Sequence, residues 1–208
     1  MNLSFKQYRA IDLGILLFLA VAAEAVTRRA AIAWFPYEAY VLSPTFAMLC
    51  IVMMRWDGFA AIHAVACGLT LCIASGADAR QFAVYCIGNC FALAAMVMFK
   101  VCGGKDKVRG KFFTTALFVA VTFCLVQIGR WLVWLPFGGS LKDIVGFFVT
   151  DLMSLLFAEL AVLIARRVDG LFEDQMAYLI RTQSERNKQQ LPDFAGDTEY
   201  GEDSDLYK

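Results

Sequence analysis

The amino-acid sequence predicts an all-α integral membrane protein with six transmembrane helices and both termini in the cytoplasm. Three observations favour this fold class. The 208 residues are 60% hydrophobic and have a mean hydropathy of +0.59, whereas soluble domains are about half apolar. The apolar residues gather in six runs. Basic residues are unevenly distributed among the segments that separate these runs.

Charged residues or clusters of Gly and Pro bound each apolar run, as expected for membrane spans of about 20 residues. The runs lie at 10–27, 39–54, 58–76, 81–102, 112–135 and 143–165. Only Arg55-Trp56-Asp57-Gly58 separates the second run from the third, so we expect a tight turn and two antiparallel helices there. Segment 28–38 is expected to be an interfacial loop.

Positive charge sets the expected orientation, because loops rich in Lys and Arg stay in the cytoplasm. With the N-terminus inside, ten basic residues face the cytoplasm and five face outward. The inner residues are Lys6, Arg9, Arg55, Lys100, Lys105, Lys107, Arg109, Lys111, Arg166 and Arg167, and the outer ones are Arg28, Arg29, Arg80, Arg130 and Lys142. We therefore expect a multi-pass protein of a bacterial-type plasma membrane.

The composition changes after the sixth run, which divides the chain into three parts. Residues 1–170 are the expected six-helix transmembrane domain, with 15 basic and 10 acidic residues. Segment 171–186 has apolar residues at helical spacing and is expected to be a cytoplasmic amphipathic helix. Segment 187–208 is acidic and polar, with Gly and Pro, and is expected to be disordered.

Several classes of function find no support in the sequence. Gly103-Gly104-Lys105 lacks the remaining residues of a phosphate-binding loop, so the chain is not expected to hydrolyse ATP itself. Histidine occurs once, at His63, and no catalytic set, metal site or cofactor site is apparent. The basic residues are too dispersed for a nucleic-acid-binding face. The seven cysteines lie mostly in apolar runs and are expected to be reduced packing residues.

Polar side chains inside apolar runs are the strongest functional signal, because such groups are costly in hydrocarbon. In the expected topology many of them lie in the outer half, together with aromatic residues of loop 28–38. One hypothesis is an outward-facing cavity that binds a small polar ligand, with the surplus of outer arginines favouring an anionic one. The candidate residues are Arg28, Arg29, Trp34, Tyr37, Asn89, Gln127, Arg130, Trp131 and Asp151. The other is that the tryptophans form an aromatic belt and Arg130 pairs with Asp151 or Glu24.

Small residues at four-residue spacing form a second pattern, which allows helices to approach closely. Two such sets are candidates for docking a partner chain. They are Ala10 with Gly14 in the first run, and Ala60, Ala64 and Gly68 in the third.

Together these features resemble the substrate-binding membrane subunit, or S component, of energy-coupling-factor vitamin transporters. The resemblance rests on length, six spans, a long first outer loop and the tight turn before a small-residue helix (RWDGFAAIHAVACG), and it covers roughly residues 8–170. It implies ligand binding in the outer half, and partners that comprise a transmembrane coupling subunit and separate ATPase subunits. The family's alanine pair on the first helix corresponds most nearly to Ala10 and Gly14.

A different class of function stays open. The chain can instead be a non-transporting anchor or integral subunit of a larger membrane complex, one that handles quinone or electrons. The amphipathic segment and acidic tail would then dock partners. A small water-soluble molecule that co-purifies with the isolated chain distinguishes the first hypothesis from the second.

Overall fold

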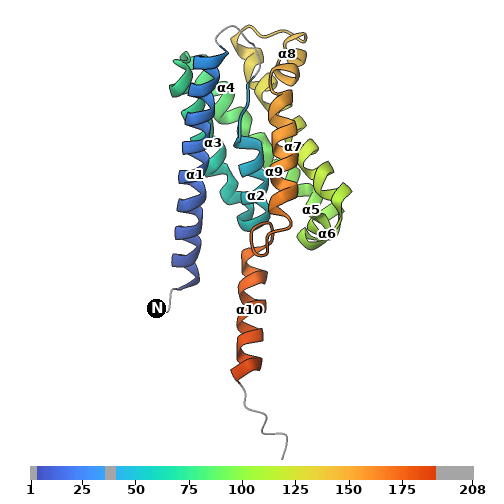
Figure 1. The fold of residues 1–208 in the computed structure, drawn as a ribbon. Coiled ribbons are helices and arrows are strands. Elements are labelled where there is room, and N and C mark those ends of the chain that lie inside the picture. The colour runs from blue at the N-terminus through green and yellow to red at the C-terminus, as the bar shows by residue number, and fades with distance from the viewer. Residues whose placement is uncertain (1–3, 36–40, 191–208) are drawn as a thin grey trace, which may run out of the picture. The chain divides into compact units, whose positions relative to one another are not determined.

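The computed structural model describes residues 4–35 and 41–190 of the chain, and side chains up to residue 185. The described residues are helical and contain no strand. Contacts divide the chain into one unit up to Asp174 and a second from Gln175 onward. The first unit holds the helical bundle that Figure 1 labels α1 to α9. In the second unit, α10 runs over Gln175–Gln190, whereas the sequence predicted a helix at 171–186.

The bundle begins with α1 (Phe5–Trp34), a helix of 30 residues. Ser4 caps its N-terminus and forms a reciprocal capping box with Gln7. At about 1.5 Å per residue this helix is about 45 Å long, which is more than a bilayer core requires. We call the end of the bundle that holds the start of α1 the lower end, and the end that holds Trp34 the upper end, as they are drawn in Figure 1.

The next two helices form a hairpin beside α1. Helix α2 (Thr45–Trp56) and α3 (Ala60–Ser75) are joined by the short helix η1 (Asp57–Phe59), and Asp57 adopts a left-handed φ of 52° at the turn. Thr45 contacts Glu24 near the upper end, Trp56 contacts Asp12 near the lower end, and Ser75 contacts Arg28 near the upper end again. The two helices are therefore antiparallel neighbours, as the turn residues predict.

The remaining helices complete the bundle. Helix α4 (Ala79–Asn89) continues through η2 (Cys90–Met96) into α5 (Val97–Val101), and the short α6 (Lys105–Gly110) precedes α7 (Phe112–Trp134) and η3 (Leu135–Phe137). Helix α8 (Asp143–Thr150) and α9 (Leu152–Ala165) follow, bent by 44° at Asp151. The break therefore interrupts the sixth expected span.

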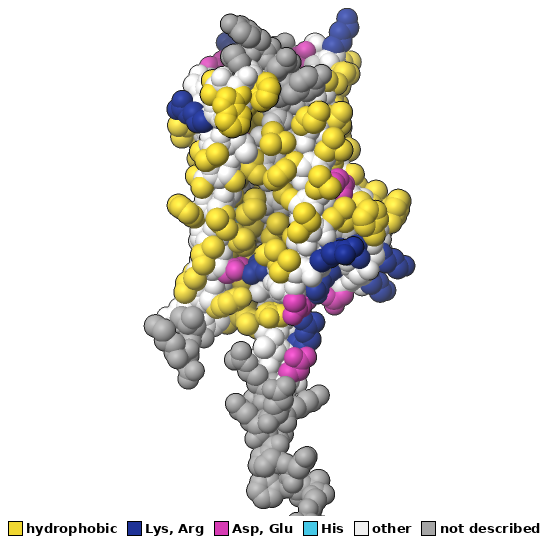
Figure 2. Space-filling model, in the orientation of Figure 1, with side chains coloured by type: hydrophobic (Ala, Val, Ile, Leu, Met, Phe, Trp, Pro, Cys, Tyr) yellow, Lys and Arg dark blue, Asp and Glu magenta, His cyan; other side chains and the backbone are white. Residues whose placement is uncertain are grey.

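The described helices agree in part with the expected membrane topology. By length and composition, four stretches are apolar enough to cross a membrane, or five if the bent pair α8–α9 counts as one span. One of these stretches, Thr45–Ser75, comprises the hairpin α2–α3, which reverses direction at Asp57–Phe59. Exposed hydrophobic side chains include Phe18, Ile73, Val97 and Leu160. Figure 2 shows that hydrophobic side chains cover much of the middle of the bundle on the face in view. Such a surface fits a lipid bilayer.

Candidate functional site

Arg130 is the centre of a buried polar network near the upper end. Its side chain is only 1% exposed, and one guanidinium nitrogen pairs with the carboxylate of Asp151. The same nitrogen donates to Gln127 Oε1 at 3.3 Å, and Nε donates to Asn89 Oδ1 at 2.9 Å. Gln127 Nε2 in turn donates to Asp151 Oδ2 at 3.0 Å. Four of the predicted site residues therefore form one connected network.

Three elements deliver these side chains. Gln127 and Arg130 are three residues apart on α7 and so share a face of that helix. Asn89 is the last residue of α4, and Asp151 stands at the break between α8 and α9. The break turns the chain at the residue that pairs with Arg130.

Glycines allow α4 and α7 to approach closely at this network. A Cβ atom at Gly88 would lie 2.7 Å from Arg130 Cα, and one at Gly129 would lie 2.7 Å from the carbonyl oxygen of Gly88. Real Cβ contacts are never this short, so the two glycines fix the crossing. The Arg130 guanidinium also lies over the rings of Tyr85 and Phe46, 4.7 and 5.3 Å from their centroids. Arg130 is thus held by ionic, amide and aromatic contacts together.

A second buried group lies near the upper end, around Glu24 of α1. Its carboxylate oxygen Oε2 accepts hydrogen bonds from Ser43 Oγ and Thr45 Oγ1, each at 2.7 Å. Ser43 N donates to Ser154 Oγ at 2.8 Å, and Ser154 Oγ donates to the Val41 carbonyl at 2.8 Å. These bonds join α1, the start of α2 and α9. The sequence marked Glu24 as a polar residue within a span but did not place it among the site residues.

The other predicted site residues do not join the Arg130 network. Arg28 is half-buried and donates from Nε to Ser75 Oγ at 2.6 Å, whereas Arg29 is exposed. Trp34 is 76% exposed, and Trp131 donates from Nε1 to the Ser140 carbonyl at 3.1 Å. Tyr37 lies outside the described residues. Among the described residues, Arg28, Arg29, Trp34 and Trp131 therefore lie outside the Arg130 network.

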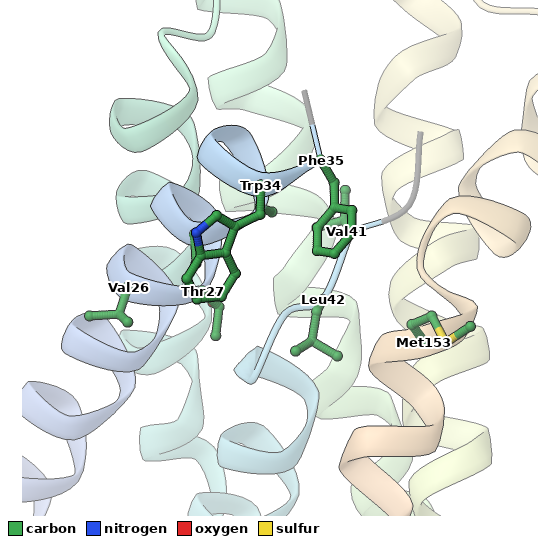
Figure 3. Close-up of a pocket in the computed structure, with 9 residues that line it drawn as sticks. Val26, Thr27, Trp34, Phe35, Val41, Leu42 and Met153 are labelled. Carbon is green, nitrogen blue, oxygen red and sulfur yellow. The ribbon is translucent and has the colours of Figure 1, made fainter. Parts of the chain in front are cut away.

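An apolar hollow of about 660 Å³ lies instead beside the upper part of α1 (Figure 3). Trp34 and Phe35 from the end of α1 face it, together with side chains from segment 41–42 and α9. The lining residues are Val26, Thr27, Ala30, Ala31, Trp34, Phe35, Val41, Leu42 and Met153. Its walls are therefore suited to apolar groups, and among the predicted site residues that the structure describes, only Trp34 lines it.

A third network, which the sequence did not reveal, lies at the lower end. The Arg55 guanidinium contacts both carboxylate oxygens of Asp12, at 2.6 and 3.1 Å, and also donates to the carbonyls of Gly170 and Leu171. Trp56 Nε1 donates to Asp12 at 2.5 Å. This network connects α1 and α2 with the segment that follows α9. The charges involved lie near the ends of apolar runs, where charged residues are ordinary, so no sequence signal singled them out.

The small residues predicted to dock a partner fall into two groups. Ala60 and Ala64 have no exposed surface, and a Cβ atom at Gly68 would lie 2.8 Å from the Tyr85 carbonyl oxygen. These three residues of α3 therefore pack the bundle itself. Ala10 and Gly14 are exposed on α1, and a Cβ atom at Gly14 would meet nothing within 4 Å. Of the two predicted sets, only Ala10 and Gly14 are accessible to a partner chain.

The cysteines lie within the described helices and the residues that link them. All seven cysteines are free, and Cys90 Sγ donates to the carbonyl of Cys86 at 3.3 Å. In the part of the chain that the structure describes, no group of three or more His, Cys, Asp or Glu side chains could hold a metal ion.

Comparisons of the chain with protein-family models, curated proteins and solved structures find no match.

Proposed function

We propose that the chain is the substrate-binding membrane subunit of an uptake transporter of the energy-coupling-factor type. One observation carries the proposal: the helix pair α8–α9 is broken by 44° at Asp151, and Asp151 pairs with the buried Arg130. Ionisable residues inside a membrane bundle are rare and costly, and they commonly mark ligand or ion pathways. Interrupted membrane helices are likewise the usual place of transporter binding sites.

The proposed ligand is a small water-soluble compound with an anionic group. Arg130 offers a planar guanidinium that binds carboxylates and phosphates well. In the described arrangement Asp151 and Gln127 occupy part of that guanidinium. Ligand binding would therefore replace the Asp151 carboxylate with the anionic group of the ligand, which requires Asp151, at the break between α8 and α9, to move away from Arg130.

The proposed topology has six crossings of a bacterial-type plasma membrane, with the lower end in the cytoplasm. It is supported by the reversal at Asp57–Phe59 and by Arg55, which connects the N-terminal part of α1 with residues after α9. Reaction of an impermeant thiol reagent with intact cells tests it. Asp78→Cys should be labelled above the unsubstituted chain and Leu206→Cys should not, and labelling of Leu206→Cys from outside would overturn the topology.

The proposal requires partner chains, a transmembrane coupling subunit and ATPase subunits. Ala10 and Gly14 are the exposed small residues at which a partner helix could approach the backbone of α1. Co-purification of wild-type chain and of Gly14→Leu from membranes tests this contact. Equal recovery of the same partner with both chains would remove it.

The decisive experiment asks whether a small molecule travels with the purified protein. The full-length chain is purified in detergent, denatured, and its released compounds are identified by mass spectrometry. We expect a polar compound with the wild type and with Arg80→Gln, an exposed arginine that serves as control, and none with Arg130→Gln. Recovery of the compound with a folded Arg130→Gln would contradict a role for Arg130 in binding.

The second candidate is a non-transporting integral subunit of a larger membrane complex. Two observations favour this candidate. The side chains of the Arg130 network are buried and bonded to one another, and the walls of the hollow are apolar. In that case no polar compound is released by the wild type, and a fixed set of partner proteins co-purifies with it. The same preparation therefore decides between the two functions.

A further inference from the structure

One carboxylate oxygen of Glu24 accepts hydrogen bonds, and the other has no hydrogen-bond partner among the described residues. Ser43 and Thr45 both donate to Oε2, whereas Oε1 is buried and has no hydrogen-bond partner among the described residues. The side chain itself has no exposed surface, and Ser43 and Thr45 are each 1% exposed. A buried oxygen of this kind normally finds a donor or a cation, because leaving it without either is costly.

The charges around Glu24 do not balance. No described Lys or Arg lies within ion-pair distance of it, and Arg130, the cation that acts on it electrostatically, is already paired with Asp151. The described ionisable groups that interact electrostatically with Glu24 are Arg130 on α7, Asp151 at the α8–α9 break and the Cys67 thiol on α3. With both carboxylates ionised, Glu24, Asp151 and Arg130 together carry one negative charge without a counterion.

We propose that Glu24, Ser43 and Thr45 form a binding site for a small monovalent cation, either Na⁺ or a proton. One uncompensated negative charge matches one positive charge, which disfavours a divalent ion. Carboxylate and hydroxyl oxygens are hard ligands, and the two hydroxyls can rotate to turn lone pairs toward a metal ion. A proton on Oε1 would neutralise the same charge.

The site shares no hydrogen bond with the Arg130 network, although Arg130 and Asp151 act on Glu24 electrostatically. Glu24 is on α1, and its hydroxyl partners lie in the segment that leads into α2, whereas Arg130 is held by α4, α7 and the α8–α9 break. Thr27 and Leu42, which line the apolar hollow, flank the site in the chain, and Thr27 Oγ1 donates to the Glu24 carbonyl at 3.1 Å. The proposal therefore does not require the transporter function.

Sodium is tested directly on the full-length protein in detergent. Binding of radioactive ²²Na⁺ is measured, and thermal unfolding is compared in sodium chloride and in choline chloride at equal ionic strength. If sodium is the ligand, the wild type binds ²²Na⁺ saturably and melts at a higher temperature in sodium chloride, and Glu24→Gln loses both effects. Glu159→Gln is the matched control, because Glu159 also has a buried oxygen without a partner, and it should retain both.

The proton is tested by infrared spectroscopy of the same proteins. A protonated Glu24 contributes a carboxylic-acid carbonyl band that is lost in Glu24→Gln and kept in Glu159→Gln. Sodium binding that depends on Glu24 identifies sodium, and the band without sodium binding identifies the proton. If Glu24→Gln does not fold, Ser43→Ala and Thr45→Val replace it, and each should weaken sodium binding or shift the band. If neither sodium binding nor the carboxylic-acid band depends on these residues, the proposal is overturned.

Discussion

The upper and lower ends of the bundle each contain a charged network, and the two differ in how far they are shielded from water. In the upper pair the side chains of Arg130 and Asp151 are 1% and 6% exposed. In the lower pair the side chains of Arg55 and Asp12 are 7% and 18% exposed. In the upper network Arg130 donates to side chains, whereas in the lower one Arg55 also donates to two backbone carbonyls.

This difference separates two roles for charge in an apolar bundle. The lower network connects α1 and α2 with the segment after α9, so closing the bundle is sufficient reason for its presence. Asp12 keeps some contact with solvent, which lowers the cost of burying it. The upper network joins helices that are already held together by close contacts at glycines and by apolar side chains. Burying its charges therefore costs more free energy than burying those of the lower network. Packing does not explain why such charges are present, whereas the ligand role proposed for Arg130 would explain it.

The largest expected effect is that of breaking the upper pair. Arg130→Ala leaves Asp151 charged and buried, and we expect the free energy of unfolding to fall by about 3–5 kcal/mol. Unfolding by denaturant in detergent measures this change. The double variant Arg130→Met/Asp151→Leu removes both charges and should recover most of the stability. If Arg130→Ala lowers the free energy of unfolding by less than about 1 kcal/mol, the pair is no stronger than an exposed surface ion pair. The two ends would then not differ in the way described above.

The next effect is expected at the lower end. Arg55→Ala removes charge-assisted hydrogen bonds to Asp12 and to the carbonyls of Gly170 and Leu171, and we expect a loss of about 1.5–3 kcal/mol. The cost of Asp12→Asn should be smaller and should decrease as salt is added, because salt screens partly exposed charges more than buried ones. Denaturant curves at low and high salt measure both. An Arg130→Ala cost with the same salt dependence as that of Asp12→Asn would show that the two networks are equally shielded.

The sequence predicted the all-helical fold, the hairpin and the members of the upper network for definite physical reasons. Long apolar runs predict membrane helices, and Arg55-Trp56-Asp57-Gly58 is too short to join two such runs except by a turn. Asn89, Gln127, Arg130 and Asp151 stand out because polar residues are rare inside such runs. Pairing of Arg130 with Asp151 was one of the alternatives that the sequence left open, and the ion pair is present.

Other features depend on contacts that a linear pattern does not contain. No Gly or Pro marks the break at Asp151, which follows Val149-Thr150, so the sequence indicated an uninterrupted span there. The spacing of Ala60, Ala64 and Gly68 predicts close helix packing but does not say whether the neighbour is in the same chain. The free oxygen of Glu24 likewise becomes visible only when its surroundings are known.

A third prediction concerns the helix crossing that supports the upper network. Gly88→Ala places a methyl group against the backbone of Arg130, where only 2.7–2.8 Å is available, so α4 and α7 must separate. Overpacking of this kind costs about 1–3 kcal/mol. Denaturant unfolding measures the loss, with Gly14→Ala as the control at an open position of α1. Unchanged stability of Gly88→Ala would mean that the crossing can open without affecting Arg130.

The smallest effect on stability is expected for Gly14→Leu, at the lower half of α1. The position is exposed and a Cβ atom there would meet nothing within 4 Å, so the free energy of unfolding should not fall by more than about 0.5 kcal/mol. Gly68→Leu is the matched variant on α3, where the side chain would meet the Tyr85 backbone at 2.8 Å, and it should destabilise strongly. If Gly14 serves partner docking, Gly14→Leu keeps its ligand and its unfolding curve but loses its partner, because leucine holds the two helix backbones apart. A destabilised Gly14→Leu would instead indicate that the surface of α1 around Gly14 packs within this chain, and Gly14 would then not serve the docking of a second protein.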